Sequence, residues 1–488
     1  MDSPSHKWQA SLTLAQTHSG FRFLGTRFTL CSTLFGMRTA RPATLFLLLI
    51  LGFTSTALLA LERQPNTIYQ GRRKALAREL HGGVALLFGN YEPPMEYQDY
   101  RQDEDFYYLT GWHEPGAALI VADAVPARAG KPALPYREVL LLPERNLRDE
   151  LFTGVKLNAA SPNVTGITGV DEVRSIRDLP GILSERGLRT VWTQLDSEPA
   201  KAALTFAQSS LGSGDTVAPQ DVRGLTKTLR SFKDPGEIDL LRKAANASVK
   251  AQEAAILAIH PGVNERAISG IITGTLLANG CERPSYPSIV GSGMNSTVLH
   301  YMANDGTMQS GDVVVMDAAG EYSMYASDVT RTVPVSGHFT DRQREIYNIV
   351  LGAQRAAAAA FVSGKSTLYN HEHPESSLDG VARNYIKTHG KDLHGQPLDK
   401  YFIHGLSHSV GIDVHDPLDT TKPLGPGSVF TIEPGIYIPE ERIGVRIEDT
   451  FYVDQNGKLQ DFIADLPHTA EDVETLMQRG KSADTTTR

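Results

Sequence analysis

Five side chains of the kinds that bind metal ions follow one another in the last third of the sequence. They are four carboxylates and one imidazole: Asp317 in VVVMDAAG, Asp328 in ASDVTRT, His408 in HGLSHSVG, Glu433 in FTIEPG and Glu448 in VRIEDT. Such a set can hold two divalent cations side by side, and a metal pair of this kind generates hydroxide at neutral pH. The five residues therefore predict a hydrolytic metal centre.

The surroundings of the four acids support this prediction. Each acid interrupts an apolar stretch, and an ionised carboxylate that is buried without a partner becomes neutral unless a cation compensates it. Any one of them alone could form a salt bridge or cap a strand edge. Together, and with a histidine in a Gly- and His-rich segment, they favour a metal site. Oxygen-rich ligation with a single imidazole suits Mn or Co, whereas zinc sites usually recruit more His or Cys.

Three further histidines lie close to these ligands in the sequence. A hydrolytic centre needs donors for the developing oxyanion and a proton for the leaving group. Histidine side chains can supply both. The candidates are His300 in VLHYMAND, His404 four positions before His408, and His415 in VGIDVHDP.

Strands must bring the acids together. GDVVVMDAAG predicts an apolar strand that ends near Asp317, and a second strand-like segment contains Asp328 eleven positions later. A hairpin needs about that distance to return to the same level, so both carboxylates can point into one pocket. Glu433 and Glu448 interrupt two more strand patterns, VFTIEPGIYI and GVRIEDTFYV.

Long helices accompany these strands. The spacing of apolar residues predicts helices at 237–259, 265–279 and about 342–362, the first of which is stopped by Pro261 and Gly262. Helices followed by paired strands predict an α+β catalytic domain. The segment 363–400 shows no clear pattern.

The first half of the chain has a different organisation. A helix-like stretch at 69–80 precedes strand-like segments in VALLFGN, FYYLTG, AALIVAD and EVLLLPE, and strands and helices alternate to about residue 225. This alternation predicts an α/β domain. A chain of 488 residues is also long enough for two domains.

Charge and cysteine content exclude some classes. A net charge of -9 argues against nucleic-acid binding, which needs clustered Lys and Arg. Cys31 and Cys281 are the two cysteines of the sequence. Removal of a leader would leave Cys281 alone, so no intramolecular disulfide could form, and we expect Cys281 to be a small buried side chain.

The first 60 residues differ from the rest of the chain. They contain five basic residues against one acid, in a protein that is otherwise acidic. Arg38 and Arg41 lead into the uncharged run 43–61, whose centre is LFLLLILGF. This order of basic start, apolar middle and small residues is typical of a secretory signal.

Met37 stands directly before these arginines, so we expect residues 1–36 to be an upstream extension and the signal to span about 37–60. Cleavage near Ala60 would export the protein to the periplasm or the exterior. An uncleaved anchor is the alternative, because 19 uncharged residues just suffice to cross a bilayer.

At the level of motifs the chain resembles a known family. LHY, VMDAAG, SDVTRT, HGLSHSVGIDVHD, TIEPGIY and RIEDT resemble the catalytic domain of the pita-bread metallopeptidases. YRQDEDFYYLTGWHEPGAALIV and LLLPERNLRDELFTG are similar to the amino-terminal domain of aminopeptidase P, the Xaa-Pro aminopeptidase. The resemblance covers roughly residues 65–478. It implies an aminopeptidase P-type domain at 65–225 and a pita-bread catalytic domain at 232–478.

The resemblance also implies how two metal ions, with Mn(II) favoured, would be held. Asp317 would chelate one ion. Asp328 and Glu448 would bridge both ions, and His408 and Glu433 would complete the second. Glu433 would in addition shuttle a proton.

Four more residues match functional positions of the family. His300 and His415 would hydrogen-bond the substrate and the tetrahedral intermediate, and His404 would line the pocket for proline. Arg446 would orient ligand carboxylates, although an exposed strand charge is its simpler interpretation. Ser409 stands where many bacterial members carry a bulky aromatic residue, so the resemblance does not define the shape of the substrate pocket there.

The implied reaction is hydrolysis of the bond between a free N-terminal residue and a following proline, by a metal-bridging hydroxide. The implied partners are peptides that begin with Xaa-Pro and further copies of the chain, as a dimer or tetramer. A prolidase, which cleaves only dipeptides, is the nearest alternative. Methionine aminopeptidase lacks a large amino-terminal domain. Inactive binding modules and creatinase-type relatives would be expected to have lost ligands, and all five are present here.

Overall fold

The computed structural model describes residues 61–93, 99–124, 133, 135–185, 190–209 and 216–485. The leader expected within residues 1–60 therefore lies outside the described residues, apart from the last residue of its apolar run, Leu61. Leu59–Arg488 forms one compact unit. No helix in the described ranges is both long enough and apolar enough to cross a membrane.

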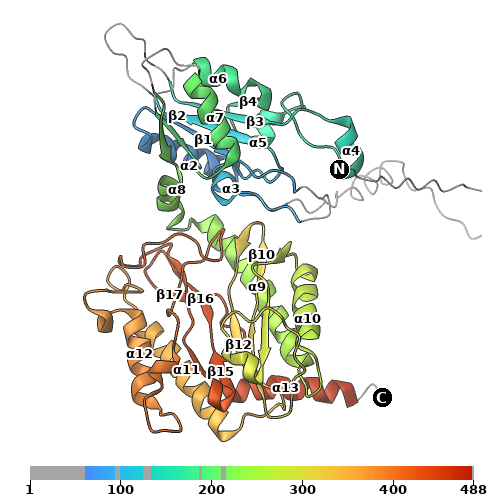
Figure 1. Ribbon diagram of the computed structural model, residues 1–488, viewed down its shortest axis with the longest axis vertical. Coiled ribbons are helices and arrows are strands. Elements are labelled where there is room, and N and C mark those ends of the chain that lie inside the picture. Colours follow the sequence, from blue (N-terminus) through green and yellow to red (C-terminus); the bar gives the residue numbers. More distant parts are fainter. Residues whose placement is uncertain are drawn as a thin grey trace, which may run out of the picture. The chain divides into compact units, whose positions relative to one another are not determined.

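A six-stranded mixed sheet organises the first part of this unit, in the order β4-β3-β2-β1-β5-β6 (Figure 1). The pairs β1/β2 and β2/β3 are antiparallel, and the other pairs are parallel. The strands are β1 Val84–Phe88, β2 Ala118–Ala122, β3 Arg137–Leu142, β4 Glu172–Ser175, β5 Thr190–Thr193 and β6 Ala218–Asp221.

Helices cover both faces of this sheet. On β1, Ala85 and Leu87 share a core with α2 and α3, whereas Val84 and Leu86 share a second core with α6 and α7. Successive strand residues point to opposite faces, so both faces of the central strands are buried, and β1 and β2 are wholly apolar. The predicted α/β arrangement is confirmed. The helices are α2 Asn66–Glu79, α3 Glu104–Thr110, α4 Leu147–Thr153, α5 Val164–Thr168, α6 Leu179–Glu185, α7 Glu198–Ser209 and α8 Arg223–Arg230, with the 3₁₀ turn η1 Ile176–Asp178.

One prediction in this part is wrong. FYYLTG was expected to be a strand, but it forms most of α3. The side chain of Asp103 accepts a hydrogen bond from the N–H of Phe106, and Gly111 ends the helix in a left-handed conformation at φ 61°. These two caps satisfy the helix ends and outweigh the strand preference of the aromatic residues.

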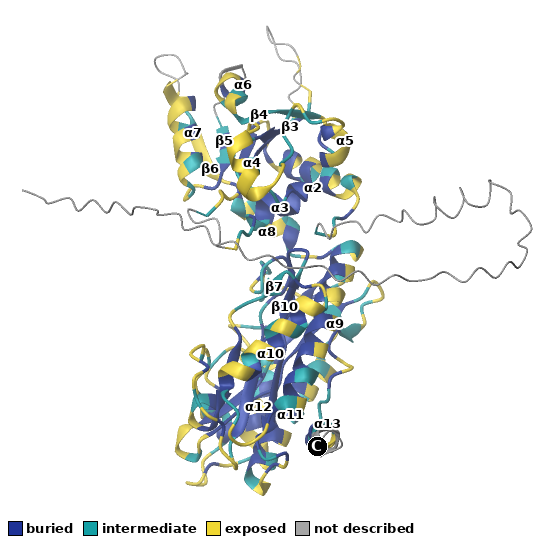
Figure 2. Ribbon diagram, turned by 90° about the vertical axis from the view of Figure 1, so that its right-hand side faces the viewer, coloured by how far each residue is buried: buried dark blue, intermediate teal, exposed yellow. Residues whose placement is uncertain are grey.

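The second part of the unit contains long helices and short antiparallel strands. Its strands are β7 Arg283–Pro284, β8 Ile289–Ser292, β9 Val313–Asp317, β10 Gly320–Tyr322, β11 Tyr325–Ala326, β12 Thr330–Pro334, β13 Val429–Ile432, β14 Gly435–Ile438, β15 Ile443–Arg446, β16 Asp449–Val453 and β17 Leu459–Asp461. They pair in the orders β11-β10-β7, β12-β9-β8, β13-β16-β17 and β14-β15. In Figure 2 the strands of this part are mainly buried, and exposed residues lie on the surrounding helices and loops.

The predicted long helices are present with small shifts at their ends. They are α9 Pro235–Ala258, α10 Glu265–Ala278 and α11 Asp341–Ala360, followed by α12 Leu378–His389 and α13 Ala470–Thr485. A capping box of Asp234 and Glu237, with Pro235 in the first turn, starts α9. Thr340 and Gln343 form the same device at α11. In Figure 1, α9 and α10 lie to one side of the strands and α11 and α12 to the other.

The segment 363–400 is ordered around α12, which the sequence pattern did not predict. Short 3₁₀ turns flank the helix: η3 is Pro374–Ser376 and η4 is Leu398–Tyr401. The side chain of Ser377 caps α12 by accepting from the N–H of Gly380. At Gly352 of α11 a Cβ atom would lie 2.3 Å from Oη of Tyr385, so this glycine lets α12 approach α11 closely. The remaining turns are η2 Gly293–Thr297 and η5 Pro439–Glu441.

Candidate metal centre

One cavity of about 480 Å³ collects every site residue that the sequence predicted. Its lining includes all nine of them: Asp317, Asp328, His408, Glu433, Glu448, His300, His404, His415 and Arg446. They are separated by up to 148 positions in the chain, between His300 and Glu448. Such convergence of polar groups in a concave site is typical of an active site.

The acids lie at strand ends and strand breaks. Asp317 is the last residue of β9 and stands opposite Thr330 of β12, with Asp328 two positions before that threonine. Glu433 directly follows β13, and Glu448 sits between β15 and β16, where it forms an isolated bridge with Thr330. The predicted pairing of the two strands next to Asp317 and Asp328 is thus present, and backbone pairing also brings Glu448 to the same place.

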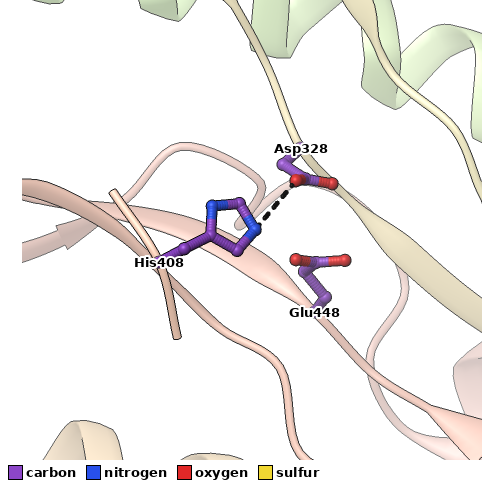
Figure 3. Close-up of side chains that lie close together, drawn as sticks. All are labelled: Asp328, His408 and Glu448. Atoms are coloured by element: carbon purple, nitrogen blue, oxygen red, sulfur yellow. Dashed lines mark ion pairs between the residues drawn. The ribbon is translucent and has the colours of Figure 1, made fainter. Parts of the chain in front are cut away.

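Asp328, His408 and Glu448 form the tightest group, with ligand atoms within 4.8 Å of one another (Figure 3). Nε2 of His408 lies 3.3 Å from Oδ2 of Asp328 and 3.4 Å from Oε1 of Glu433. Nδ1 of His408 lies 3.1 Å from the carbonyl oxygen of Ser409. Nδ1–H donates to this carbonyl oxygen, and Nε2 faces the carboxylates. Metal-binding histidines usually have this orientation.

A buried arginine sits beside the carboxylates. Nη2 of Arg446 donates to Oδ2 of Asp317 at 2.6 Å, Nε donates to Oγ1 of Thr330 and Nη1 to Oη of Tyr437. Arg446 is only 4% exposed. The interpretation of Arg446 as an exposed strand charge is therefore wrong, because its guanidinium orients a predicted metal ligand.

Hydroxyl groups hold the other carboxylates. Thr330 donates to Oε2 of Glu448 at 2.6 Å, and Thr431 donates to Oε1 of Glu433 at 3.1 Å. Oη of Tyr286 lies 2.6 Å from Oδ1 of both Asp317 and Asp328. Because a hydroxyl carries one hydrogen, this tyrosine donates to one of the two aspartates at a time.

The sequence analysis did not identify Tyr286, Tyr437, Thr330 or Thr431. A signal exists for the threonines, because Thr330 follows Asp328 by two residues and Thr431 precedes Glu433 by two. Residues two apart on an extended chain share a face, which places Thr431 beside Glu433 and directs Thr330 towards the side of Asp328, where its hydroxyl meets Glu448. No comparable signal exists for the two tyrosines, whose contacts depend on packing between distant segments.

The electrostatics of the pocket call for a cation. Burial raises the pKa of Asp317, and the neighbouring Asp328 raises it further against the effect of Arg446. Burial and the other three carboxylates raise the pKa of Glu448, and burial raises the pKa of Glu433 to about 7. Arg446 and a protonated His408 are the positive charges beside these four acids, and together they do not offset the rise in the pKa values of Asp317, Glu433 and Glu448, whereas divalent cations would keep the carboxylates ionised. The donor set fits divalent metal ions.

The three predicted histidines line the same cavity in different environments. His300 and His415 are exposed, and the His415 ring lies 4.1 Å from the ring of His408. His404 is more buried, and burial together with Arg446 lowers its pKa to about 4. Its Nδ1 lies 2.8 Å from the carbonyl oxygen of Gly405, so its Nε2 accepts from Oη of Tyr437 at 2.9 Å.

A second group of possible metal ligands lies behind the site, formed by Asp449, Asp461 and His468. Here a cation is already supplied by the protein. Nη2 of Arg331 donates to Oδ1 of Asp449 at 2.7 Å and lies 3.1 Å from Nε2 of His468. Nη1 of Arg331 also donates to the carbonyl oxygen of Glu448 at 2.9 Å. This group is an ion-pair network that braces the strand break carrying Glu448.

Ser409, which departs from the family pattern, does not line the cavity. Ser409 is 2% exposed, pairs with Phe430 and is not among the residues that line the cavity. Its hydroxyl lies 3.3 Å from Nζ of the buried Lys233. The side chain after His408 therefore points away from the cavity, because neighbouring residues of an extended segment alternate in direction.

Comparisons with known proteins show the family to which the chain belongs. Residues 239–455 match the model of metallopeptidase family M24, and residues 69–192 match the aminopeptidase P, N-terminal domain model. The chain is 34% identical to the Xaa-Pro aminopeptidase of Escherichia coli K12 over 439 residues, which cover 84% of this chain and 97% of that protein. It is 32% identical to the human Xaa-Pro aminopeptidase 3 over 396 residues, covering 77% and 76%.

The fold comparison gives the same result. A structure of zinc-substituted E. coli aminopeptidase P in complex with product matches with a TM-score of 0.76 and 30% identity, covering 86% of this chain and 99% of that one. The match extends over both sheet systems, and the mixed α and β architecture expected from the motifs is confirmed. The chain belongs to metallopeptidase family M24, in the branch that carries an aminopeptidase P amino-terminal domain.

Proposed function

We propose that the protein is a metal-dependent aminopeptidase that releases the N-terminal residue from peptides with proline in the second position. The convergence of all nine predicted residues in one cavity carries this proposal. The name of the E. coli relative, Xaa-Pro aminopeptidase, supplies the substrate class.

Two metal ions are assigned to the five ligands. Asp317 would hold one ion, Asp328 and Glu448 would be shared by both, and His408 and Glu433 would complete the second. The short distances among Asp328, His408 and Glu448 support this arrangement. The donor set of four carboxylates and one imidazole favours Mn(II) over zinc.

The protein's own groups then carry the remaining steps. When bound, the metal ions lower the pKa of water and supply a hydroxide that attacks the peptide carbonyl. Glu433, with Oε2 3.8 Å from Nδ1 of His404, is placed to take up a proton and return it. His300 and His415 line the cavity and offer N–H donors to the developing oxyanion. The proline nitrogen must be protonated as it leaves.

A dipeptidase is the second candidate. The chain is 40% identical to the Xaa-Pro dipeptidase of Pyrococcus furiosus, but only over 236 residues, which cover 47% of this chain and 63% of that protein. The E. coli aminopeptidase match instead runs through the amino-terminal sheet as well. The longer match favours the aminopeptidase.

A competition between substrates tests the assignment. The purified protein would be stripped with a chelator, reloaded with Mn(II), Co(II) or Zn(II), and given a tripeptide Xaa-Pro-Xaa, the dipeptide Xaa-Pro and a matched tripeptide without proline. We expect cleavage of the proline tripeptide, with Mn(II) restoring the highest rate. Preference for the dipeptide would favour the second candidate. Asp328→Asn should lower the rate at least about a hundredfold, and an unchanged rate would exclude the metal mechanism.

We further propose export and self-association. The basic and apolar leader sequence supports export followed by cleavage near Ala60, with an uncleaved anchor as the alternative, and N-terminal sequencing of the mature protein distinguishes them. On α4, Leu151 is 85% and Phe152 63% exposed, and apolar exposure of this kind supports a dimer or tetramer. Light scattering during size-exclusion chromatography measures the assembly.

A further inference from the structure

The segment Phe402–His408, here called the histidine segment, carries both His404 and His408. Strand β13 pairs with its later half: the N–H of Glu433 donates to the carbonyl oxygen of Leu406, and the N–H of Thr431 to that of His408. The segment lies outside every helix and strand assigned in the described ranges. Its other backbone groups need separate partners, since buried N–H and C=O groups are costly to leave unpaired.

Two side chains of α12 supply partners at the beginning of the segment. Nη1 of Arg383 donates to the carbonyl oxygen of Phe402 at 2.8 Å, and Nη2 donates to that of His404. Oδ1 of Asp379 accepts from the N–H of Leu406 at 3.1 Å. Oδ2 of the same carboxylate accepts from Nε of Arg383 at 2.8 Å, so the two side chains hold each other in place.

A tyrosine supplies the partners at the end of the segment. Oη of Tyr369 donates to the carbonyl oxygen of Ser407 at 2.7 Å and accepts from the N–H of Ser407 at 3.0 Å. A Cβ atom at Gly405 would lie 2.3 Å from this oxygen, so the glycine allows the close approach. One hydroxyl thus fixes both backbone groups of the residue directly before His408. The ring of Tyr369 also lines the cavity.

The geometry of the α12 pair is stiff. The guanidinium of Arg383 stacks over the ring of Phe402 at 4.3 Å from its centroid, and its planar fork reaches two carbonyl oxygens and one carboxylate together. Such a fork loses little conformational freedom for each hydrogen bond that it forms. The side chain of Asp379 is 14% exposed, which limits competition from water.

We propose that Tyr369, Asp379 and Arg383 act as a clamp that positions His404 and His408. The clamp comes from the segment 363–400, and it takes the place of a neighbouring strand along the histidine segment. The three residues are positioning residues: they hold the backbone of the histidine segment at Phe402, His404, Leu406 and Ser407. Displacement of a catalytic group by about 1 Å costs on the order of a hundredfold in rate. The predicted effects on peptide cleavage rest on the proposed function. The predicted effects on metal affinity rest on the metal ligands alone.

Tyr369→Phe removes both hydrogen bonds and keeps the ring in the cavity wall. We expect the affinity of the stripped protein for Co(II), measured by calorimetry, to fall about tenfold, and the visible absorption of the Co(II) form to change. For a proline tripeptide, kcat should fall about 10- to 100-fold while KM changes less than threefold, because the cavity wall is preserved. Retention of Co(II) affinity and kcat within twofold would overturn the clamp.

A conservative pair at Asp379 separates positioning from general stability. Asparagine keeps an oxygen that can accept from the N–H of Leu406 and loses the bond from Nε of Arg383, whereas alanine loses both. Asp379→Asn should stay within about threefold of the parent in Co(II) affinity, whereas Asp379→Ala should lose about tenfold. Equal values for the two variants would count against the clamp.

Ile386→Val serves as the matched control. Ile386 is fully buried on α12, and this change lowers stability without removing a hydrogen bond to the histidine segment. Even if this variant loses as much melting temperature as Tyr369→Phe, its Co(II) affinity should remain that of the parent. If it loses as much affinity as Tyr369→Phe, the effect is structural and the clamp is refuted. If the parent cleaves no proline peptide but Co(II) affinity still depends on Tyr369, the proposed function fails and the clamp stands.

Discussion

Arg446 and Asp317 form a buried ion pair beside the proposed metal centre, with Nη2 of the arginine 2.6 Å from Oδ2 of the aspartate. The same guanidinium donates to Thr330, whose hydroxyl donates in turn to Glu448. One cation therefore orients two predicted metal ligands. It also occupies a carboxylate oxygen of Asp317 that a metal ion could otherwise use, so it restricts which oxygen faces the metal.

Arg446→Lys should lower kcat/KM about 10- to 100-fold. Lysine keeps a positive charge but lacks the fork that reaches Asp317, Thr330 and Tyr437 together. Steady-state kinetics on a proline tripeptide, with metal content measured in parallel, checks this. Arg344→Lys, an exchange of the same kind at an arginine paired with Glu471 and Glu474 outside the cavity, is the control. Equal activity of the two variants would show that the fork at Arg446 has no function.

Thr431→Val should weaken metal binding about tenfold. The change removes the hydroxyl that donates to Glu433 at 3.1 Å and that accepts from the N–H of His408 at 3.2 Å, while the volume is nearly unchanged. Hydrogen-bond partners of metal ligands typically contribute 10- to 100-fold in affinity. Calorimetric titration with Mn(II) measures the change. Thr431→Ser keeps the hydroxyl and should bind as the parent does; a defect of equal size in both variants would contradict the explanation.

Metal binding should weaken as pH falls and should release protons. Burial alone would lower the pKa of His408, but hydrogen bonding to Asp328 and the charge of Glu433 raise it to about 9, and the pKa of Glu433 is about 7. At pH 7 the imidazole is therefore protonated, and a metal ion must displace that proton because ligands bind in their deprotonated forms. Affinity should fall steadily from pH 9 to pH 6. Calorimetry in buffers with different ionisation enthalpies counts the protons; identical heats in all buffers would contradict the prediction.

Asp416 lies in the loop that carries His415. Protonation of its carboxylate should contribute to unfolding of the protein in acid. Burial alone would raise the pKa of this carboxyl, but Lys233 at 2.9 Å and Arg230 at 2.6 Å lower it below its usual value of 3.8. A lowered pKa in the folded state means that the stability is complete above about pH 4 and is lost as pH falls through the folded pKa.

Asp416→Asn should therefore lower the free energy of unfolding by about 3–5 kcal/mol at pH 7, because the buried Lys233 loses its carboxylate partner and the buried Arg230 keeps only Asp105. The same variant should show a flatter dependence of stability on pH below about pH 4. Urea unfolding at several pH values measures both effects. Asp419→Asn, at an exposed aspartate of the same loop, is the control. An unchanged acid dependence in Asp416→Asn would show that this carboxyl does not titrate on unfolding.

Much of the centre was predictable because its signals are local. Asp317, Asp328, Glu433 and Glu448 are conspicuous as acids inside apolar strand patterns, and the histidines lie within short motifs near them. The long helices were predictable for the same reason, since apolar spacing, caps and prolines act over a few residues. FYYLTG failed because its caps, Asp103 and Gly111, outweighed the strand preference of its aromatic residues.

The sequence by itself thus determined the ligand types, the strand ends that carry them and the family. Only the tertiary structure decided what holds the ligands. Tyr286 reaches Asp328 across 42 positions, and Tyr369 reaches Ser407 across 38, with no periodicity that connects them. The direction of the Ser409 side chain likewise depends on the segment's pairing with β13. Local patterns record the preferences of neighbouring residues, whereas these contacts arise when distant segments pack and must satisfy each other's polar groups.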